Sequence, residues 1–246
     1  QAYKITPEQL AAAITPKTRM LFLNSPSNPT GMAYTADELR GLADVLRQHP
    51  HVLVATDDMY EHVLCSEESF HNIAMVAPDL MDRIVVLSGV SKAYAMTGWR
   101  IGYAAGPAPI IAAMKKIQSQ STSNPCSIAQ HAALAALQGD QSFIGEMVTE
   151  FKARHERLVE GLNAIEGIKA IPADGTFYSF PNIEGLMAAK GVSTDVELCE
   201  LLLQEQKVAL VPGTAFGAPG HFRLSFAAAQ EVLDDAVRRI AAFAAK

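Results

Sequence analysis

The sequence lacks the features that mark several classes of protein. No apolar run approaches the length of a membrane span. Lys and Arg number 20 against 26 Asp and Glu, so the formal charge is −6, and no basic cluster is present. We therefore expect neither nucleic acid nor a membrane as a partner.

Cysteine is also scarce. Cys65, Cys126 and Cys199 are the three cysteines, and they lie far apart in the chain. An odd number at this spacing fits neither a zinc site nor a disulfide framework, and we expect no metal. Thiols outside disulfides are typical of a reducing compartment, which predicts a cytoplasmic protein. We expect each cysteine to be a buried structural residue.

The first half of the chain alternates strand and helix patterns. A capping box at Thr35–Glu38 predicts a helix to about residue 49. Short apolar runs predict strands at 19–24, 52–56, 83–88 and 101–105. Strands separated by helices of this length predict an α/β fold, with a mostly parallel sheet and flanking helices.

The second half has a different pattern. Apolar residues and His155 recur at steps of four and three, which predicts one long helix over about 141–166. Shorter elements follow: strands at 168–171, 177–180, 208–211 and 222–226, a helix after a capping box at Thr194–Glu197, and a last helix from about 230. We expect a large domain over 1–145 and a smaller α+β domain over 146–246, joined by the long helix.

Polar groups follow three consecutive predicted strands. Asn28 lies in the turn after the first strand, Asp57 and Tyr60 follow the second, and Lys92 follows the third. Open α/β sheets bind ligands at the carboxyl ends of their strands, so we expect these groups to converge on one crevice. Taken singly, each has a plainer interpretation, as a turn residue, a solvated loop acid or a surface lysine.

Lys92 is the most informative of these residues. Apart from Lys92 and Arg100, the stretch around it carries no charge. A lysine in such a segment is a candidate for losing its solvation and its charge. Only a neutral amine attacks a carbonyl, so the segment favours a lysine that forms a Schiff base.

The run SGVSKAYAMTGWRIGY, Ser88–Tyr103, resembles the cofactor-lysine signature of the class I, fold-type I, pyridoxal-phosphate-dependent aminotransferases. Four further segments resemble that family in the expected order: NSPSNPTG from Asn24, TDDMYEH from Thr56, VPGTAFG from Val211 and FRLSFA from Phe222. The resemblance covers the whole chain and is greatest to the aspartate/aromatic branch.

The resemblance implies a role for each matching residue. Lys92 would hold pyridoxal phosphate as a Schiff base and shuttle the proton of the substrate Cα. Asp57 would pair with the protonated pyridine nitrogen, which keeps the ring electron-accepting. Tyr60 and Asn28 would bind the phenolic oxygen, and Arg100 the phosphate. Arg223 would bind the substrate α-carboxylate as a two-pronged fork, with Asn28 beside it.

One position departs from the family pattern. Many members have a phosphate-binding serine three residues before the lysine, where this chain has Gly89. Ser88 and Ser91 are its neighbours, and either is an alternative phosphate ligand. We choose Ser91.

Family members also carry a long segment before the point that matches Gln1. The resemblance therefore implies an N-terminally truncated chain with an incomplete large domain, and a homodimer for the full-length protein. That segment supplies further sheet strands and further contacts to the cofactor.

The function that the resemblance implies is transamination between an α-amino acid and a 2-oxo acid, of the aspartate/aromatic type. The signature leaves three alternatives open. A lyase or a synthase of the same fold shares the cofactor chemistry. A cofactor-binding sensor domain of a transcription regulator has a similar domain, and an isolated fragment can be inactive.

Overall fold

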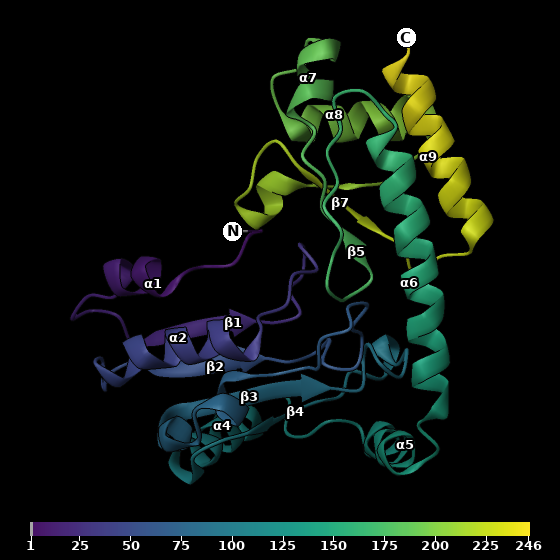
Figure 1. Cartoon of the computed structure of the whole chain (residues 1–246). Coiled ribbons are helices and arrows are strands. Elements are labelled where there is room, and N and C mark those ends of the chain that lie inside the picture. Colours follow the sequence, from purple (N-terminus) through teal and green to yellow (C-terminus); the bar gives the residue numbers. More distant parts are fainter. Residues whose placement is uncertain (1) are drawn as a thin grey trace. The chain divides into compact units, whose positions relative to one another are not determined.

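The structure, a computed structural model, describes residues 2–246, which form two compact units (Figure 1). The first unit contains the residues up to Ser27 together with Met32–Glu146. The second contains Asn28–Gly31 and Met147–Lys246.

The first unit is built on a four-stranded sheet. Its strands are β1 (Met20–Asn24), β2 (Leu53–Asp57), β3 (Ile84–Gly89) and β4 (Gly102–Ala105), in the order β1-β2-β3-β4. The first three are parallel, and β4 is antiparallel to β3. The prediction of an α/β fold with a mostly parallel sheet is confirmed.

Several helices of the first unit pack on a buried apolar core. The helices of this unit are α1 (Pro7–Ala13), α2 (Ala36–Arg47), α3 (Ile73–Val76), η1 (Pro78–Arg83), η2 (Thr97–Trp99), α4 (Ala108–Ser119) and α5 (Ser127–Gln138). Of these, η2 and α4 bury no residue. Leu39, Leu42 and Leu46 of α2 are almost completely buried with residues of β2 and β3. The capping box that starts α2 is present in both directions, as predicted.

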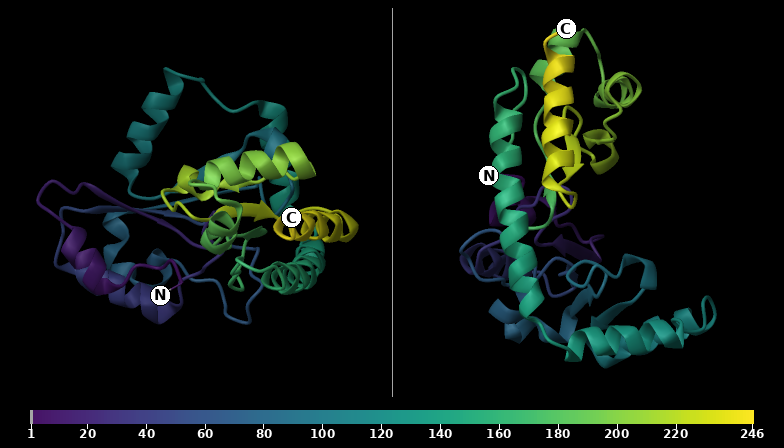
Figure 2. Two further views of the ribbon diagram at one scale, coloured as in Figure 1. Left: turned by 90° about the horizontal axis from the view of Figure 1, so that it is seen from above. Right: turned by 90° about the vertical axis from the view of Figure 1, so that its right-hand side faces the viewer.

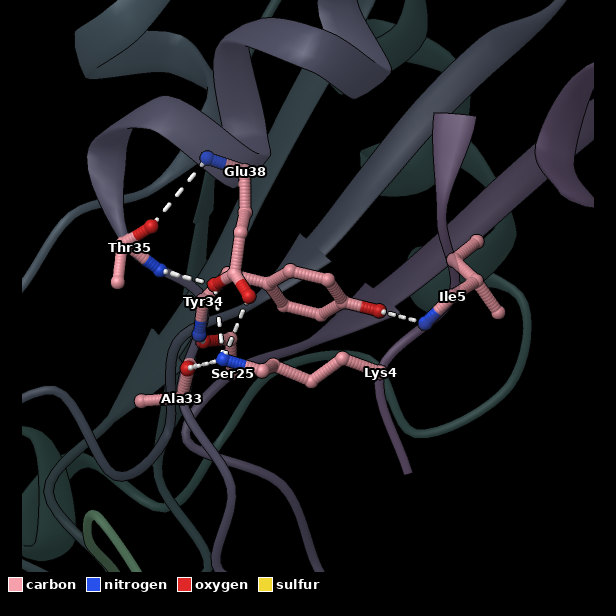
Figure 3. Close-up of polar contacts among 7 residues, drawn as sticks. All are labelled: Lys4, Ile5, Ser25, Ala33, Tyr34, Thr35 and Glu38. Carbon is pink, nitrogen blue, oxygen red and sulfur yellow. Dashed lines mark hydrogen bonds and ion pairs between the residues drawn. The ribbon is translucent and has the colours of Figure 1, made fainter. Parts of the chain in front are cut away.

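A cluster of polar contacts fixes the segment that leads into α2 (Figure 3). The Lys4 amine lies 2.7 Å from a carboxylate oxygen of Glu38. The Tyr34 hydroxyl accepts a hydrogen bond of 2.9 Å from the Ile5 N–H, and the Tyr34 N–H donates to the Ser25 hydroxyl at 3.1 Å. The segment that enters α2 is thereby tied to the end of β1.

The second unit is an α+β arrangement, as expected. Its sheet has the order β5-β7-β6, formed by β5 (Tyr178–Ser179), β7 (Phe222–Ser225) and β6 (Val211–Pro212), with antiparallel pairing. The helices are α7 (Glu184–Lys190), α8 (Asp195–Leu201), η3 (Leu202–Gln206), η4 (Gly213–Phe216) and α9 (Gln230–Ala244), with most of α6 (Ser142–Asn163).

The long helix α6 matches the predicted stripe. His155, Leu158 and Leu162 are buried on it. In the second unit α9 runs beside α6 (Figure 2), and the Arg157 guanidinium forms an ion pair of 2.6 Å with Asp234 across the two helices. The periodic pattern therefore identified both the helix and its buried face.

Several predicted details are wrong. The strand expected at 168–171 is a single bridge, Lys169 to Asn182, and the strand expected at 208–211 begins only at Val211. The Thr194 hydroxyl caps α8, but the reciprocal Glu197 carboxylate accepts from the Ser193 N–H instead of the Thr194 N–H. A short apolar run does not by itself determine whether the segment pairs with another strand.

The prediction for the cysteines holds for two of them. Cys65 and Cys199 are buried, whereas Cys126 is exposed. Cys126 lies just before α5 in a segment, 119–128, whose residues are all exposed. Cys126 is exposed because it lies in a loop between two helices, and no periodic pattern in the sequence predicts the exposure of a loop residue.

Candidate functional site

The carboxyl ends of β1, β2 and β3 meet at one edge of the first sheet. Asp57 is in register with Asn24 on one side and with Leu87 on the other. The Asn24 side-chain amide donates to the Asp57 carbonyl at 3.2 Å, and the Asp58 N–H donates to the Leu87 carbonyl at 2.8 Å. The backbone at Asp57 and Asp58 thus holds the three strand ends together.

Asp57 is a half-buried acid. One of its oxygens accepts a hydrogen bond of 3.2 Å from the Met59 N–H. Burial raises the pKa of Asp57 above its ordinary value, and the Met59 hydrogen bond opposes that shift. Within residues 2–246 no lysine or arginine forms an ion pair with this carboxylate. A cation brought to this edge of the sheet would favour the charged acid.

Tyr60 and Lys92 lie against each other. Tyr60 is buried in a turn closed by hydrogen bonds from the Glu61 N–H to Asp58 and from the Val63 N–H to Tyr60. The Lys92 amine is 5.8 Å from the centre of the Tyr60 ring. Lys92 is partly buried, so its loss of solvation is partial in this structure. An aromatic face beside an amine contributes about 0.5–2 kcal/mol to holding a cation there.

Gly89 has a steric reason to be glycine. A Cβ at this position would lie 2.9 Å from the Ile101 carbonyl oxygen and 3.1 Å from the Gly102 Cα. A serine at this position would therefore force the backbone to shift. The departure from the family pattern follows from the close approach of β3 and the chain entering β4.

The two neighbouring serines differ in what they contact. Ser88 is buried, and its hydroxyl donates to the Glu61 carboxylate at 2.8 Å. Ser91 is only half-buried. Because the Ser88 proton is already engaged, Ser91 is the better placed of the two to donate to an added phosphate. A phosphate contact by Ser91 stays a prediction.

Arg100 is exposed and has a left-handed backbone conformation, with φ of 57°. One of its guanidinium nitrogens donates to the Thr97 carbonyl at 2.8 Å, across the short helix η2. A guanidinium has five N–H donors, so this bond leaves donors for an anion. Its role as a phosphate ligand also stays a prediction.

Arg223 organises the candidate site of the second unit. It lies on β7, and its guanidinium donates to the Asn28 side-chain oxygen at 2.8 Å. The guanidinium carbon is 4.4 Å from the centre of the Tyr178 ring and 5.0 Å from that of the Phe216 ring. In the described part of the chain no carboxylate forms an ion pair with Arg223. A guanidinium held in this way is ready for an external carboxylate.

The turn that carries Asn28 is also fixed within the second unit. Gly31 has a φ of +73°, and a Cβ there would lie 2.4 Å from the Ala173 Cβ. The Gly175 N–H donates to the Gly31 carbonyl at 2.9 Å. Nearby, the Ala173 N–H donates to Nε2 of His155 at 3.3 Å. Burial lowers the pKa of His155, which suits a neutral ring that accepts this bond.

Several residues of the site escaped the sequence analysis. Asn24 and Glu61 support the strand ends, while Tyr178 and Phe216 flank the guanidinium. The sequence does show aromatic residues before the strand that carries Arg223, and Tyr178 and Phe216 are among them. No spacing rule, however, indicates that they contact Arg223.

Two further features bear on function. Within residues 2–246 no helix is both long enough and apolar enough to cross a membrane. Over the same residues, no group of three or more His, Cys, Asp or Glu side chains is placed to hold a metal ion.

Comparison with known proteins gives concordant matches. The family model described as aminotransferase class I and II matches residues 1–240. An aspartate/prephenate aminotransferase from Nitrosomonas europaea is 52% identical over 98% of the chain, which covers 62% of that relative. The chain spans about three fifths of the length of the relatives it matches.

Solved structures agree with the sequence match. An aspartate aminotransferase from Rhizobium meliloti matches 98% of the chain with a TM-score of 0.93 at 46% identity, and 62% of that structure is covered. An aspartate aminotransferase from Thermus thermophilus with maleate matches 98% with a TM-score of 0.89 at 39% identity, and 61% of it is covered.

Proposed function

Because the chain belongs to the class I and II aminotransferase family, we propose that its gene product transfers an amino group between an α-amino acid and a 2-oxo acid, with pyridoxal phosphate as cofactor. The observation that carries this proposal is the grouping of Lys92, Tyr60 and Asp57 at the ends of adjacent strands. We take the first unit as the C-terminal part of the cofactor-binding domain, and the second as the small domain.

The residues present fit this cofactor. Pyridoxal phosphate carries an aldehyde, a phenolate and a pyridinium, which require an amine, a phenol and an acid. Lys92 supplies the amine and Tyr60 the phenol. Asp57 supplies a half-buried acid that no lysine or arginine of residues 2–246 neutralises. When bound, pyridoxal phosphate supplies a cationic ring that accepts the electron pair released at the substrate Cα. Asp57 would hold the proton on the ring nitrogen, and the Tyr60 hydroxyl would bind the phenolic oxygen.

Lys92 has two tasks in this proposal. Its amine would hold the cofactor covalently, and the same amine would later carry the proton of the substrate Cα. The second task requires the amine to lie within hydrogen-bond reach of that proton. Arg100, Ser91 and Asn28 would complete the contacts to the cofactor.

Arg223 would bind the α-carboxylate that every α-amino acid carries. Its guanidinium is oriented by Asn28 and by two aromatic rings, so little rotamer freedom remains to be lost on binding. Binding of maleate by the Thermus protein agrees with carboxylate recognition in the family. The names of the relatives support aspartate and prephenate-type substrates for this branch.

The same proposal extends to partners. Small amino acids and 2-oxo acids would be the substrates, and the gene product would form a homodimer as the family resemblance implies. A cytoplasmic location also stays a prediction.

The test is an assay of the gene product with L-aspartate and 2-oxoglutarate, in which glutamate is measured. We expect glutamate in amounts equal to the aspartate consumed. Consumption of aspartate without glutamate would instead favour a lyase or synthase. The Lys92→Ala variant should lose the activity, whereas Lys115→Ala, which changes an exposed lysine on α4, should retain it.

A further inference from the structure

Asp58 is a buried acid whose charge has no obvious use in the proposed reaction. It is 1% exposed, and within residues 2–246 no lysine or arginine forms an ion pair with it. Burial of a carboxylate without a cation costs free energy unless hydrogen bonds satisfy its oxygens. Asp58 lies between Asp57 and Tyr60 in the sequence. The groups that donate hydrogen bonds to its carboxylate therefore also affect the positions of those two residues.

Two donors hold the Asp58 side chain. The Thr56 hydroxyl donates to one oxygen at 2.6 Å, and the Asn72 side-chain amide donates to the other at 2.5 Å. Asn72 in turn caps α3, because its side-chain oxygen accepts from the Met75 N–H at 2.9 Å. The Asp58 carboxylate therefore links the end of β2 to the start of a helix 14 residues further along the chain.

The backbone of Asp58 makes two more bonds. Its N–H donates to the Leu87 carbonyl of β3 at 2.8 Å, and its carbonyl accepts from the Glu61 N–H at 2.8 Å. The second bond closes the turn that buries Tyr60. A single residue thus fixes the end of β2 against β3 and also closes the turn that follows it.

We propose that Asp58 is a positioning residue, which holds Asp57 and Tyr60 in place for the cofactor through its bond to Asn72. This inference rests on the proposed function. Asp58 itself touches no reacting atom. If the bond to Asn72 is lost, the turn of residues 58–61 loses its attachment to α3, and the neighbouring phenol and carboxylate lose their fixed placement.

The charges around Asp58 are consistent with a carboxylate whose role is to accept hydrogen bonds. Burial raises the pKa of Asp58 to about 6, and the carboxylates of Glu61 and Asp57 act in the same direction. The groups that face it from β2 and α3 are the neutral donors of Thr56 and Asn72, which oppose that shift. A leucine or an alanine would avoid the cost of burial but could not accept either bond.

The pair of Asp58 and Asn72 can be exchanged to test the bond itself. Asn72→Asp alone brings two carboxylates face to face with no donor between them. Asp58→Asn alone would keep both bonds, because its amide presents an acceptor to Asn72 and a donor to the Thr56 hydroxyl. The double variant Asp58→Asn/Asn72→Asp restores one donor and one acceptor, and aspartate remains a good helix N-cap. Asp82→Asn, at an exposed acid of the same unit, is the matched control.

The readout is the dissociation constant of pyridoxal phosphate, measured on the gene product by absorbance. Asn72→Asp should raise that constant about tenfold or more, which corresponds to the loss of one hydrogen bond to a charged group. The double variant should return to within about threefold of the wild type, and Asp82→Asn should not differ from it. Thr56→Val removes only one of the two donors and should give a smaller increase.

Two outcomes would overturn the inference. One is cofactor affinity unchanged in Asn72→Asp. The other is a double variant that regains thermal stability but not affinity. Hydrogen exchange of the Glu61 and Met75 amides without cofactor gives an independent measure. Its rate should rise in Asn72→Asp and return to the wild-type value in the double variant. If the wild type binds no cofactor, the proposed function fails, while amide exchange still tests the positioning of the turn.

Discussion

The two units hold their principal charged groups by different means. In the first unit Asp57 stands at the end of a central strand, bonded through its backbone and neighbours to strands on both sides. In the second, Arg223 stands on a short strand and is held by two aromatic rings and one amide. Backbone pairing places both residues in their sheets, but the Arg223 guanidinium is also oriented by the side chains around it.

This contrast indicates where each site should be sensitive to substitution. Backbone bonds fix the end of β2, so in the first unit the loss should come from the functional group itself or from the Asp58 carboxylate that holds the turn after it. In the second unit the supporting side chains carry the geometry, and changing them should weaken binding while leaving the chemistry intact. The predictions below test this contrast.

The largest effect is expected for Asp57→Asn. The amide retains the shape but not the charge that would keep a cofactor ring protonated. We expect kcat to fall by about 10²–10³-fold, the range for removing one preorganised electrostatic contact. Steady-state kinetics would measure this, with Asp82→Asn as the control. An unchanged kcat would contradict the role of Asp57.

The next effect is expected for Arg223→Lys. Lysine keeps the charge but loses the planar fork and the stacking between Tyr178 and Phe216. A loss of about 1.5–3 kcal/mol is typical for a hydrogen bond to a charged group, so KM for the amino donor should rise about 10–100-fold. If instead kcat falls while KM stays constant, Arg223 does not bind the substrate carboxylate.

A smaller effect is expected from the rings. Tyr178→Leu removes one aromatic face from Arg223, while Tyr178→Phe keeps it. With about 0.5–2 kcal/mol for a cation over a ring, KM should rise about 2–30-fold in the leucine variant and change little in the phenylalanine variant. An equal rise of KM in both variants would show that the hydroxyl matters and not the ring face, and no rise in either would contradict a role for the ring.

The smallest effect concerns the pH dependence of stability. His155 has a lowered pKa when folded, so the unfolded chain binds the proton more readily, and stability should fall as pH drops below about 6.5. His155→Gln keeps an acceptor for the Ala173 N–H but does not titrate there. Urea unfolding at several pH values between 5 and 8 should show a weaker pH dependence in the variant. An identical dependence would exclude His155 as its source.

Much of the first unit could be predicted because its signals are local. The capping box at Thr35, the buried strand runs and the residues directly after them are contiguous in the sequence. Parallel neighbours then bring strand ends together without further information, which is how Tyr60 and Lys92 come to lie against each other. The long helix α6 was predictable for the same reason.

What sequence reasoning missed depends on contacts between distant residues. Tyr178 and Phe216 contact Arg223 through the pairing of short strands, and the short strands at 168–171 and 208–211 were themselves misplaced. Asn72 reaches Asp58 only because the loop between them returns to β2. Side-chain partners of this kind leave no periodicity or spacing in the chain.

Trapping with borohydride identifies the lysine that holds the cofactor. The gene product is incubated with pyridoxal phosphate, reduced with borohydride and digested, and the modified lysine is identified by mass spectrometry. We expect a pyridoxyl group on Lys92, in the peptide that contains Tyr94 and Trp99. A protein that transaminates yet carries the label on a different lysine, or on none, would contradict this role of Lys92.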